Sequence, residues 1–368
     1  MVNVQVKRER AFNPLHLSGF GVKITVQDLK HTSALRVTNG REDDRQSISY
    51  AFRPRRFPFS SIVVEGHSGY VSLDAFHWLA SNKIPLFLMK YNGALVSSLL
   101  PKSPSKPELR SAQWQAANDP KTCFPIARAF VQGKVARTIQ VLDYLSELHD
   151  LTREVQTVAE QSLKLDYATT VREASIIEAQ IANRYWWALA RLLPNHLSFD
   201  GRQSGRMRNS SDPVNASLNY GYGLLEGECM KAVSYIGLES TVGFLHNFTA
   251  RSHGHIKHAL VYDLMEPYRW LVDLTVLEMF TSSQLDIRDF YFTGDDYTYR
   301  FEHDAKLRFI RQLVERFKKR VMYDRELCSW STVIQDKTRQ LANHLSDPTR
   351  PIDFTDPAPI LERIMETA

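Results

Sequence analysis

The sequence contains little cysteine and no long hydrophobic run. Its three cysteines, Cys123, Cys229 and Cys328, lie far apart and form no CxxC pair, so neither a disulfide framework nor a thiolate zinc site is indicated. The longest strongly apolar runs, such as residues 84–89, fall far short of the roughly 20 residues that a membrane-spanning helix needs. The first ten residues become charged before a signal-type apolar stretch develops. We therefore expect a cytoplasmic protein with reduced thiols.

Several catalytic motifs are absent as well. The sequence has no GxxxxGKS/T phosphate-binding loop and no HExxH metal motif, and its nearest approach to a GxSxG serine motif, at residues 66–69, has the wrong spacing. The glycine-rich segment 221–227 does not follow a predicted strand, so it is not a dinucleotide fingerprint. No internal repeat of roughly 20 to 50 residues is present, which excludes a solenoid. Chemistry driven by a nucleotide is unsupported.

Basic residues are concentrated in two places. The net charge is +5, but residues 1–110 carry 16 Lys and Arg against 8 Asp and Glu, whereas the rest of the chain carries 30 against 33. A second basic run, residues 306–325, contains eight Lys or Arg and two acidic residues. Such patches suit a polyanion, since neutralised phosphates release their counterions. A solvated helix face is an equally good interpretation of the second run.

The hydrophobic pattern changes along the chain from the period of strands to that of helices. Alternation in Val22, Ile24 and Val26 and again in the segment 48–52 predicts strands in the first hundred residues. A helix that begins after Asp212 and ends at Gly237 has a capping residue and a helix-ending glycine at the expected places. Its three interior glycines suggest close approach of a neighbouring backbone, or tight helix packing alone.

These patterns predict an α+β fold in two domains. A β-rich domain occupies residues 1–100, and a larger all-α domain occupies residues 125–345. The Pro-, Ser- and Lys-rich stretch between them, residues 101–124, is predicted to be a linker. The Pro- and Asp-rich end, residues 346–368, is predicted to be a loosely ordered tail.

Three residues far apart in sequence, Glu178, His246 and Glu266, are candidate ligands of one divalent cation, because two carboxylates and an imidazole suit such an ion. Each also has an ordinary structural interpretation. Glu178 could be a surface residue and His246 a histidine at the core boundary. Asp263 and Glu266 could form a capping pair at a helix start. We expect Asp263 to cap and Glu266 to coordinate.

A rival metal site is the cluster His253, His255 and His258, since three imidazoles would suit zinc. The cluster is flanked by Arg251 and Lys257. A zinc site is therefore the less favoured interpretation. The composition is more typical of an exposed basic loop that contacts phosphate.

Four motifs, in their order along the chain, resemble those of the CRISPR-associated integrase, the first and nearly universal protein of spacer acquisition. They are EAQIANRY at 178–185, DPVNASLNYGYGLLEGE at 212–228, GFLH at 243–246 and YDLMEPYR at 262–269. The segment 62–93 is similar to the strand, short helix and strand of the family's β-domain. In one respect the sequence departs from many relatives: twenty residues separate His246 from Glu266, and the His-rich loop occupies the excess.

The resemblance implies a metal-dependent DNA endonuclease and integrase that joins the 3′-hydroxyl ends of short duplexes to a repeat array. It implies Mg²⁺ or Mn²⁺ held by Glu178, His246 and Glu266. It also implies a homodimer formed through the β-domain and a heterohexamer with a small second CRISPR adaptation protein. Candidate nucleic-acid contacts are Arg251, Lys257, Arg269, Asn215, Asn219 and Tyr220. Two rivals stay open: a DNA-binding assembly subunit with an inert acidic triad, and a zinc hydrolase.

Overall fold

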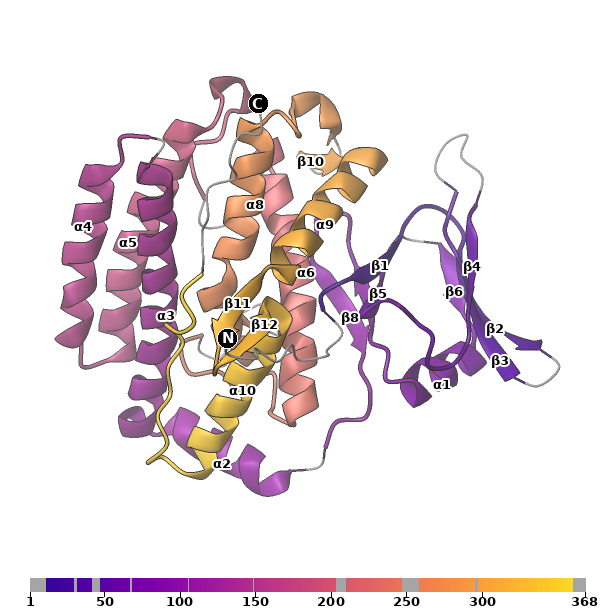
Figure 1. Cartoon of the computed structure of the whole chain (residues 1–368), viewed down its shortest axis with the longest axis horizontal. Coiled ribbons are helices and arrows are strands. Elements are labelled where there is room, and N and C mark those ends of the chain that lie inside the picture. The colour runs from indigo at the N-terminus through magenta and orange to yellow at the C-terminus, as the bar shows by residue number, and fades with distance from the viewer. Residues whose placement is uncertain are drawn as a thin grey trace, which may run out of the picture.

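The chain folds into two parts that lie side by side, a β-rich part and a larger, mostly helical part (Figure 1). The computed structural model describes residues 11–29, 32–41, 47–66, 68–104, 106–147, 149–202, 210–246, 258–294 and 297–359. The predicted order, β-rich first and helical second, is confirmed. None of the described helices is both long and apolar enough to cross a membrane.

The β-rich part consists of two four-stranded sheets and one helix. One sheet has the order β4-β3-β2-β6, with β4 at Ser49–Phe52, β3 at Thr32–Thr38, β2 at Val22–Leu29 and β6 at Gly69–Val71. The other has the order β1-β5-β7-β8, with β1 at Pro14–Leu17, β5 at Ser61–Glu65, β7 at Leu86–Met89 and β8 at Leu95–Leu99. Helix α1 (Leu73–Ser81) contacts β2.

Alternation predicts the inward face of β2 and fails for β4. Val22 and Ile24 are buried, as expected. Ile48 and Tyr50 are instead 56% and 42% exposed. Strand β4 is the edge of its sheet, and of this alternating segment only Phe52 packs against the apolar cluster of the β-rich part.

The helical part begins inside the predicted linker. Its helices are α2 (Pro107–Asn118), α3 (Pro120–Ser146), α4 (Thr152–Ser162), α5 (Val171–Leu192), α6 (Pro213–Ile236), α7 (Ala259–Met265), α8 (Trp270–Thr281), α9 (His303–Lys318) and α10 (Trp330–Ser346). Short 3₁₀ turns are η1 (Leu163–Asp166), η2 (Asn195–Leu197), η3 (Glu266–Tyr268) and η4 (Ile287–Asp289). Helix α2 packs on α3 and α10, and the Gln113 side chain donates to two backbone carbonyls that follow α6. The domain limits themselves stay a prediction.

Two hairpins interrupt the helices, a feature that the prediction of an all-α domain did not include. They pair β9 (Phe290–Thr293) with β10 (Thr298–Phe301), and β11 (Arg320–Tyr323) with β12 (Glu326–Ser329). Each strand has only four residues. Segments this short do not give a period that distinguishes strand from helix.

Helix α6 runs through the core of the helical part and is buried along most of its length (Figure 1). The Asp212 side chain caps it, and Gly237 ends it with φ of 93°, both as predicted. A Cβ added at Gly223 would come within 1.8 Å of the Gly93 carbonyl oxygen, and one at Gly221 within 2.4 Å of the Val272 side chain. The glycines therefore permit close approach of the β7–β8 turn and of α8.

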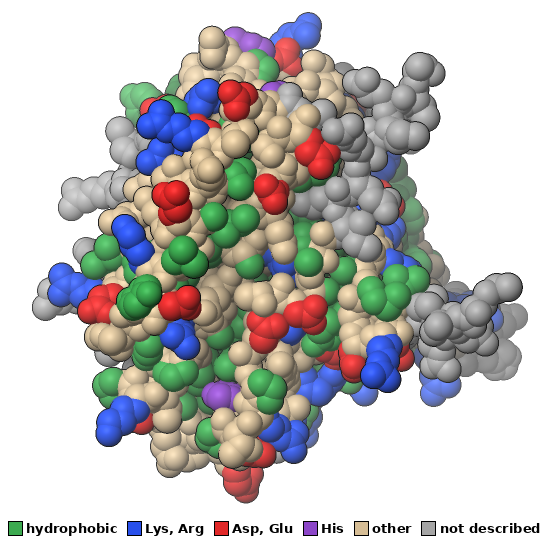
Figure 2. Space-filling view, turned by 60° about the vertical axis from the view of Figure 1, so that its left-hand side comes forward, with side chains coloured by type: hydrophobic (Ala, Val, Ile, Leu, Met, Phe, Trp, Pro, Cys, Tyr) green, Lys and Arg blue, Asp and Glu red, His purple; other side chains and the backbone are tan. Residues whose placement is uncertain are grey.

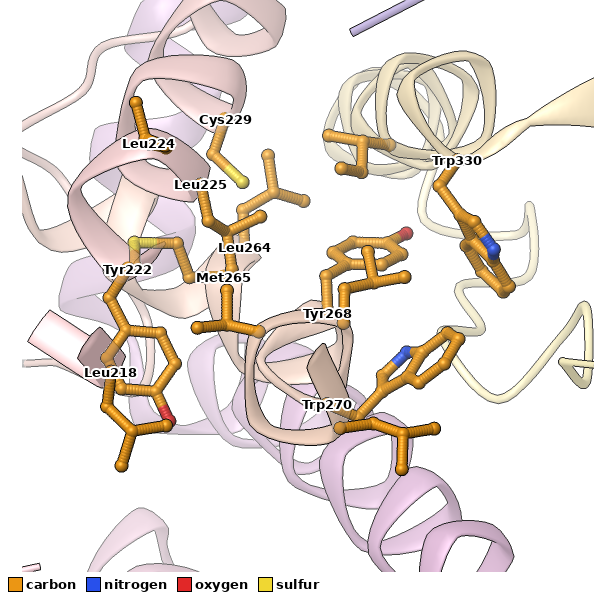
Figure 3. Packing of buried hydrophobic residues seen from close by; sticks show 14 of the residues in the cluster. Leu218, Tyr222, Leu224, Leu225, Cys229, Leu264, Met265, Tyr268, Trp270 and Trp330 are labelled. Carbon is orange, nitrogen blue, oxygen red and sulfur yellow. The ribbon is translucent and has the colours of Figure 1, made fainter. Parts of the chain in front are cut away.

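The core beside α6 brings together side chains from α6, α7, η3, α8 and α10 (Figure 3). Tyr222 and Cys229 come from α6, Leu264 from α7, Trp270 from α8 and Trp330 from α10. The two tryptophans meet edge to face with ring centroids 5.2 Å apart. This apolar packing fixes the positions of α6, α7 and α8, which carry or border the residues of the candidate site.

A buried polar network joins the β-rich part to the helical part. Glu65 on β5 is fully buried and forms an ion pair with Lys306 of α9, with Nζ 2.6 Å from Oε1. The Tyr220 hydroxyl donates to the other carboxylate oxygen at 2.9 Å, and His16 Nε2 lies 3.1 Å from it. Burial alone would raise the pKa of Glu65, but His16 and Lys306 outweigh it and lower the pKa to about 2. The carboxylate is therefore ionised within the interface.

The described part of the predicted tail is docked, in contrast to the loose order expected for it. Phe354 is 1% exposed and stacks on Phe130 of α3, with ring centroids 4.3 Å apart. Lys337 of α10 donates to the carbonyl of Asp353 at 2.8 Å. The sequence interpretation weighed the polar and proline residues of this stretch and overlooked its apolar side chains, of which Phe354 supplies the anchor and Ile352 packs beside the core.

Candidate metal centre

Two of the three predicted ligands, Glu178 and Glu266, meet at a fourth residue although they are distant in sequence, and the third, His246, lies beside Glu266. Glu178 lies on α5, Glu266 begins η3, and both helical segments pack against α3. Lys134 of α3 extends its ammonium group between them. It forms an ion pair with Glu178 Oε1, and its Nζ lies 2.7 Å from Glu266 Oε2. His246 Nε2 is 3.8 Å from Glu266 Oε1. Glu266 thus lies between a second carboxylate, reached through Lys134, and an imidazole.

Asp263 fixes the orientation of His246. Its carboxylate accepts the backbone N–H groups of Phe244, Leu245 and His246 at 2.6 to 3.0 Å. The same carboxylate lies 2.7 Å from His246 Nδ1. With Nδ1 engaged, Nε2 is the ring nitrogen left facing Glu266, the arrangement that carboxylate partners impose on metal-binding histidines.

The capping-pair prediction for Asp263 and Glu266 is wrong. Helix α7 begins at Ala259 with His258 at its cap, and the Tyr262 amide already bonds back to the His258 carbonyl. Asp263 therefore lies inside the helix, and Glu266 follows the helix end. The buried Asp263 carboxylate instead accepts the three backbone N–H groups of residues 244–246, which would otherwise lack this partner.

Glu266 is ionised although it is only 5% exposed. Burial would raise its pKa, but Arg269, Lys134 and His246 together lower the pKa to about 2. Arg269 donates Nε–H to Oε1 at 3.0 Å. Oε2 is buried and accepts no well-aligned hydrogen bond from the described residues, so its 2.7 Å contact with Lys134 is an ion pair of poor hydrogen-bond geometry. This oxygen keeps its capacity to bind a cation.

The donor types suit a hard divalent cation, and the ammonium group of Lys134 bridges the two carboxylates. As arranged, no three His, Cys, Asp or Glu side chains of the described residues are positioned to hold a metal ion. Two carboxylates with one imidazole are nevertheless the chemistry expected for Mg²⁺ or Mn²⁺, with the imidazole favouring Mn²⁺. The oriented Nε2 of His246, and the buried Oε2 of Glu266 that accepts no well-aligned hydrogen bond from the described residues, are the observations that support this fit.

Beside this centre lies a cavity of about 190 Å³ that is lined by cationic and aromatic side chains. Those of interest are Lys134, Arg202, Arg269, Tyr185, Tyr222 and Asp273. Arg202 donates to the amide oxygens of Asn215 and Asn219 at 2.7 and 2.9 Å. The two asparagines predicted to contact DNA or orient ligands thus hold an arginine at the cavity. The arginine is the group placed to meet a phosphate.

Asp273 of α8 is buried within the wall of this cavity. Its carboxylate accepts from the hydroxyls of Tyr222 and Tyr185, the latter at 3.2 Å. Burial raises the pKa of Asp273 to about 6, against the opposing effects of the Tyr222 hydrogen bond and the charge of Arg269. Sequence analysis missed both Asp273 and Lys134. Both are charged residues among mostly apolar residues of predicted helices, and that pattern was the available indication of a functional role.

Other predicted residues do not come to this site or are not described. Tyr220, a predicted DNA contact, is 1% exposed and belongs to the buried interface network. Arg251, Lys257, His253 and His255 lie outside the described residues. His258 is described, with Nδ1 3.2 Å from the Ser240 hydroxyl. The zinc alternative is thus untested by the described residues.

Two of the eight cations in the second basic run are buried in ion pairs, and the other six are exposed. Lys306 is buried against Glu65, and Arg316 is buried in an ion pair with Glu278. The side of the molecule that includes α4 and α5 also carries acidic and basic side chains intermixed (Figure 2).

Comparison with known proteins gives consistent matches. The family model of CRISPR associated protein Cas1 matches residues 34–315. The CRISPR-associated endonuclease Cas1 1 of Archaeoglobus fulgidus is 27% identical over 300 residues, covering 76% of this chain and 84% of that protein. The Cas1 1 endonuclease of Thermus thermophilus is 32% identical over 278 residues, covering 72% and 80%. A casposase bound to its integration product superimposes with a TM-score of 0.85 at 30% identity, covering 96% of each chain.

Proposed function

This chain belongs to the Cas1 family of CRISPR-associated proteins, and on that premise we propose that it is a metal-dependent DNA integrase. It joins the 3′-hydroxyl ends of short DNA fragments to a repeat array by phosphodiester exchange, with accompanying endonuclease activity. The observation that carries the proposal is the convergence of Glu178 and Glu266 on one cationic group, with His246 Nε2 beside them. Two relatives of this chain are named endonucleases, which is consistent with the proposal.

Glu178, Glu266 and the Nε2 of His246 would hold Mg²⁺ or Mn²⁺. When bound, such a cation polarises a scissile phosphate and stabilises the charge that develops as a hydroxyl attacks it. Asp263 keeps His246 oriented for this role. Phosphodiester exchange is nearly neutral in energy, which agrees with the lack of a nucleotide-binding motif in the sequence.

Arg202 and Arg269 support the same reaction through the adjoining cavity. Both guanidinium groups line it, and both lie over the Tyr222 ring, at 5.4 and 4.7 Å from its centroid. An arginine held by an aromatic face and by fixed amide oxygens loses little freedom when it binds an anion. The cavity thus suits phosphate oxygens of the DNA strand that enters the metal centre.

The proposed assembly is a homodimer formed through the β-rich part, and two such dimers flanking a dimer of a small second adaptation protein. Support for a partner surface comes from exposed apolar side chains of the β-rich part. Phe20, Tyr70 and Leu73 are 69%, 55% and 77% exposed. Such residues are costly to leave in water unless another surface covers them.

The test is DNA joining with Mn²⁺ by purified protein carrying Glu178→Ala or His246→Ala. Labelled duplex donor and a repeat-containing target supply the substrates. We expect both substitutions to abolish joining, while the exposed residues Glu160 and His77, each changed to Ala, leave it intact. If the two site variants still join DNA, the acidic triad is inert and the protein is a DNA-binding assembly subunit. If activity instead follows zinc and the cluster of His253, His255 and His258, the hydrolase alternative holds.

The match to a casposase favours a second candidate. That protein is similar over 96% of both chains and is bound to an integration product. The candidate is an integrase of the casposase kind that uses the same metal centre on a target other than a CRISPR repeat. Joining that needs no second adaptation protein and does not prefer repeat DNA would favour this candidate over the first.

A further inference from the structure

Lys134 occupies the point at which the proposed metal ligands meet. It stands in the middle of α3, and its side chain is 23% exposed. Its ammonium group contacts one oxygen from Glu178 and one from Glu266. No other cationic group of the described residues is paired with both acids. The lysine therefore balances the charge of a site that would otherwise hold two closely spaced carboxylates.

We propose that Lys134 is a built-in counter-cation, which holds the two carboxylates in the metal-free protein and is displaced when the divalent cation binds. The inference rests on the proposed function, since it takes Glu178 and Glu266 as metal ligands. Lys134 is a positioning residue in this scheme, because it acts through the carboxylates.

The two cations cannot occupy the centre together. A magnesium ion lies about 2.1 Å from its carboxylate oxygens, so an ion shared by both acids must stand between them. The ammonium nitrogen already stands there, 2.7 Å from Glu266 Oε2. A divalent ion a few ångströms from an ammonium in a poorly hydrated site meets strong repulsion. Glu266 Oε1, which faces His246 Nε2 at 3.8 Å, also accepts a hydrogen bond from Arg269, so a second positive charge already lies beside that oxygen.

The cavity next to the centre gives the displaced ammonium a place to go. Lys134 and Asp273 both line it. The Asp273 carboxylate accepts from the Tyr185 and Tyr222 hydroxyls, and the ammonium group would be a third, charged donor to it. The four-carbon stem of lysine allows such a movement within one cavity. In this scheme Lys134 pairs with Glu178 and Glu266 in the metal-free protein and turns toward Asp273 in the same cavity when the divalent cation binds.

The experiment measures Mn²⁺ binding to the full-length protein without DNA, from the free Mn²⁺ signal in electron paramagnetic resonance. Lys134→Met keeps the length of the side chain and removes the charge. We expect it to bind Mn²⁺ at least about tenfold more tightly than the unchanged protein, because the competing cation is gone. Lys134→Arg keeps the charge and is expected to bind no more tightly. Lys121→Met, an exposed lysine on the same helix, is the matched control and should leave binding unchanged.

A second comparison tests the destination of the lysine. Asp273→Asn should weaken Mn²⁺ binding severalfold where Lys134 is present, and should have no such effect in the Lys134→Met background. Unchanged Mn²⁺ affinity in Lys134→Met, or an equal effect of Asp273→Asn in both backgrounds, overturns the inference. If Lys134→Met does not fold, as judged by thermal unfolding in EDTA, Lys134→Gln replaces it. If neither variant folds, Asp273→Asn in the otherwise unchanged protein decides. Weaker Mn²⁺ binding then supports the displacement of Lys134, and unchanged Mn²⁺ binding contradicts it.

The same titration separates this inference from the proposed function. Glu178→Gln and Glu266→Gln should each abolish the tight Mn²⁺ site. If the unchanged protein binds no Mn²⁺, or binding survives both substitutions, the proposed metal centre itself fails. If binding depends on both acids and Lys134→Met has no effect, the role given to Lys134 fails by itself.

Discussion

Asp263 holds His246 by its ring and by its backbone at once, with one carboxylate oxygen 2.7 Å from Nδ1 and 2.8 Å from the amide nitrogen. The two residues are seventeen positions apart. Burial lowers the pKa of His246, but the hydrogen bond and charge of Asp263, with the charge of Glu266, outweigh it and raise the pKa. A carboxylate with this many donors determines both the course of the chain at 244–246 and the direction in which the imidazole faces.

Asp263→Asn should therefore impair the metal centre without removing a ligand. An amide accepts fewer of the four donors and carries no charge to orient the imidazole. We expect Mn²⁺ affinity and the DNA-joining rate to fall roughly 10- to 100-fold, and stability to fall by about 2 kcal/mol. Asp143→Asn, an exposed position on α3, is the control. Unchanged Mn²⁺ affinity in Asp263→Asn would remove the positioning role.

The glycines of α6 predict opposite outcomes for the same substitution one turn apart. Gly223→Ala places a Cβ 1.8 Å from the Gly93 carbonyl oxygen, so the β7–β8 turn must move. We expect a loss of about 2 to 3 kcal/mol in the free energy of unfolding. At Gly227 the new Cβ would make ordinary contacts of 3.5 Å with the Phe87 ring. Gly227→Ala should be neutral or stabilise the helix by up to about 1 kcal/mol. Denaturant unfolding of both proteins checks this, and equal effects would contradict the close-approach account.

The interface network predicts how stability falls in acid. The pKa of Glu65 is lowered from 4.5 to about 2 in the folded protein, chiefly by His16 and Lys306 against the opposing effect of burial. A lowered folded pKa stabilises the protein above pH 4.5, and that stabilisation is lost as pH falls from 4.5 toward 2. Lys306→Met leaves a buried carboxylate without its ammonium partner, which should cost about 3 kcal/mol at pH 7.

The paired substitution Glu65→Gln with Lys306→Met is the control for this network. It removes both charges and should recover much of the loss. Urea unfolding from pH 3 to 7 measures the effect. A single Lys306→Met protein as stable as the unchanged one would show that the ion pair contributes nothing across this interface.

The carboxyl group of Glu226 in α6 should make the stability of the protein depend on pH in the opposite direction. Burial raises its pKa from 4.5 to about 7, although a hydrogen bond from Tyr262 and the charge of Arg269 oppose the rise. The folded protein holds this proton over a range in which the unfolded chain has lost it, so stability falls as pH rises from 4.5 to about 7. Glu226→Gln should be more stable than the unchanged protein by about 2 kcal/mol at pH 8 and similar at pH 4. A stability difference that does not vary between pH 4 and 8 would contradict this.

The sequence predicts the order of the two parts and the caps of α6, because those depend on local patterns. Period-two alternation identifies β2, and Asp212 with Gly237 delimits a helix whose bounds the structure reproduces. The candidate ligands emerged from motifs, and their closeness follows from packing of α3, α5 and η3 that no local pattern encodes. Their role as ligands stays a prediction.

What sequence analysis missed depends on contacts between distant segments. Lys134 is a candidate site residue only because α5 and η3 bring two acids to it. These acids, Glu178 and Glu266, lie 44 and 132 positions after it in the sequence. Phe354 anchors the tail because α3 presents Phe130 opposite it. Asp263 had the spacing of a capping residue, but α7 begins earlier and leaves its carboxylate to bind the backbone at 244–246. In each case a long-range partner outweighed the local interpretation.

The account depends above all on Glu178, His246 and Glu266 binding one divalent cation. Anomalous diffraction at the manganese edge, from crystals of the full-length protein soaked in MnCl₂, tests this directly. The account predicts one strong peak within coordination distance of a Glu178 oxygen, a Glu266 oxygen and His246 Nε2. A peak at the histidines near His258 with none among these three side chains would contradict it, as would crystals with no ordered manganese at the centre.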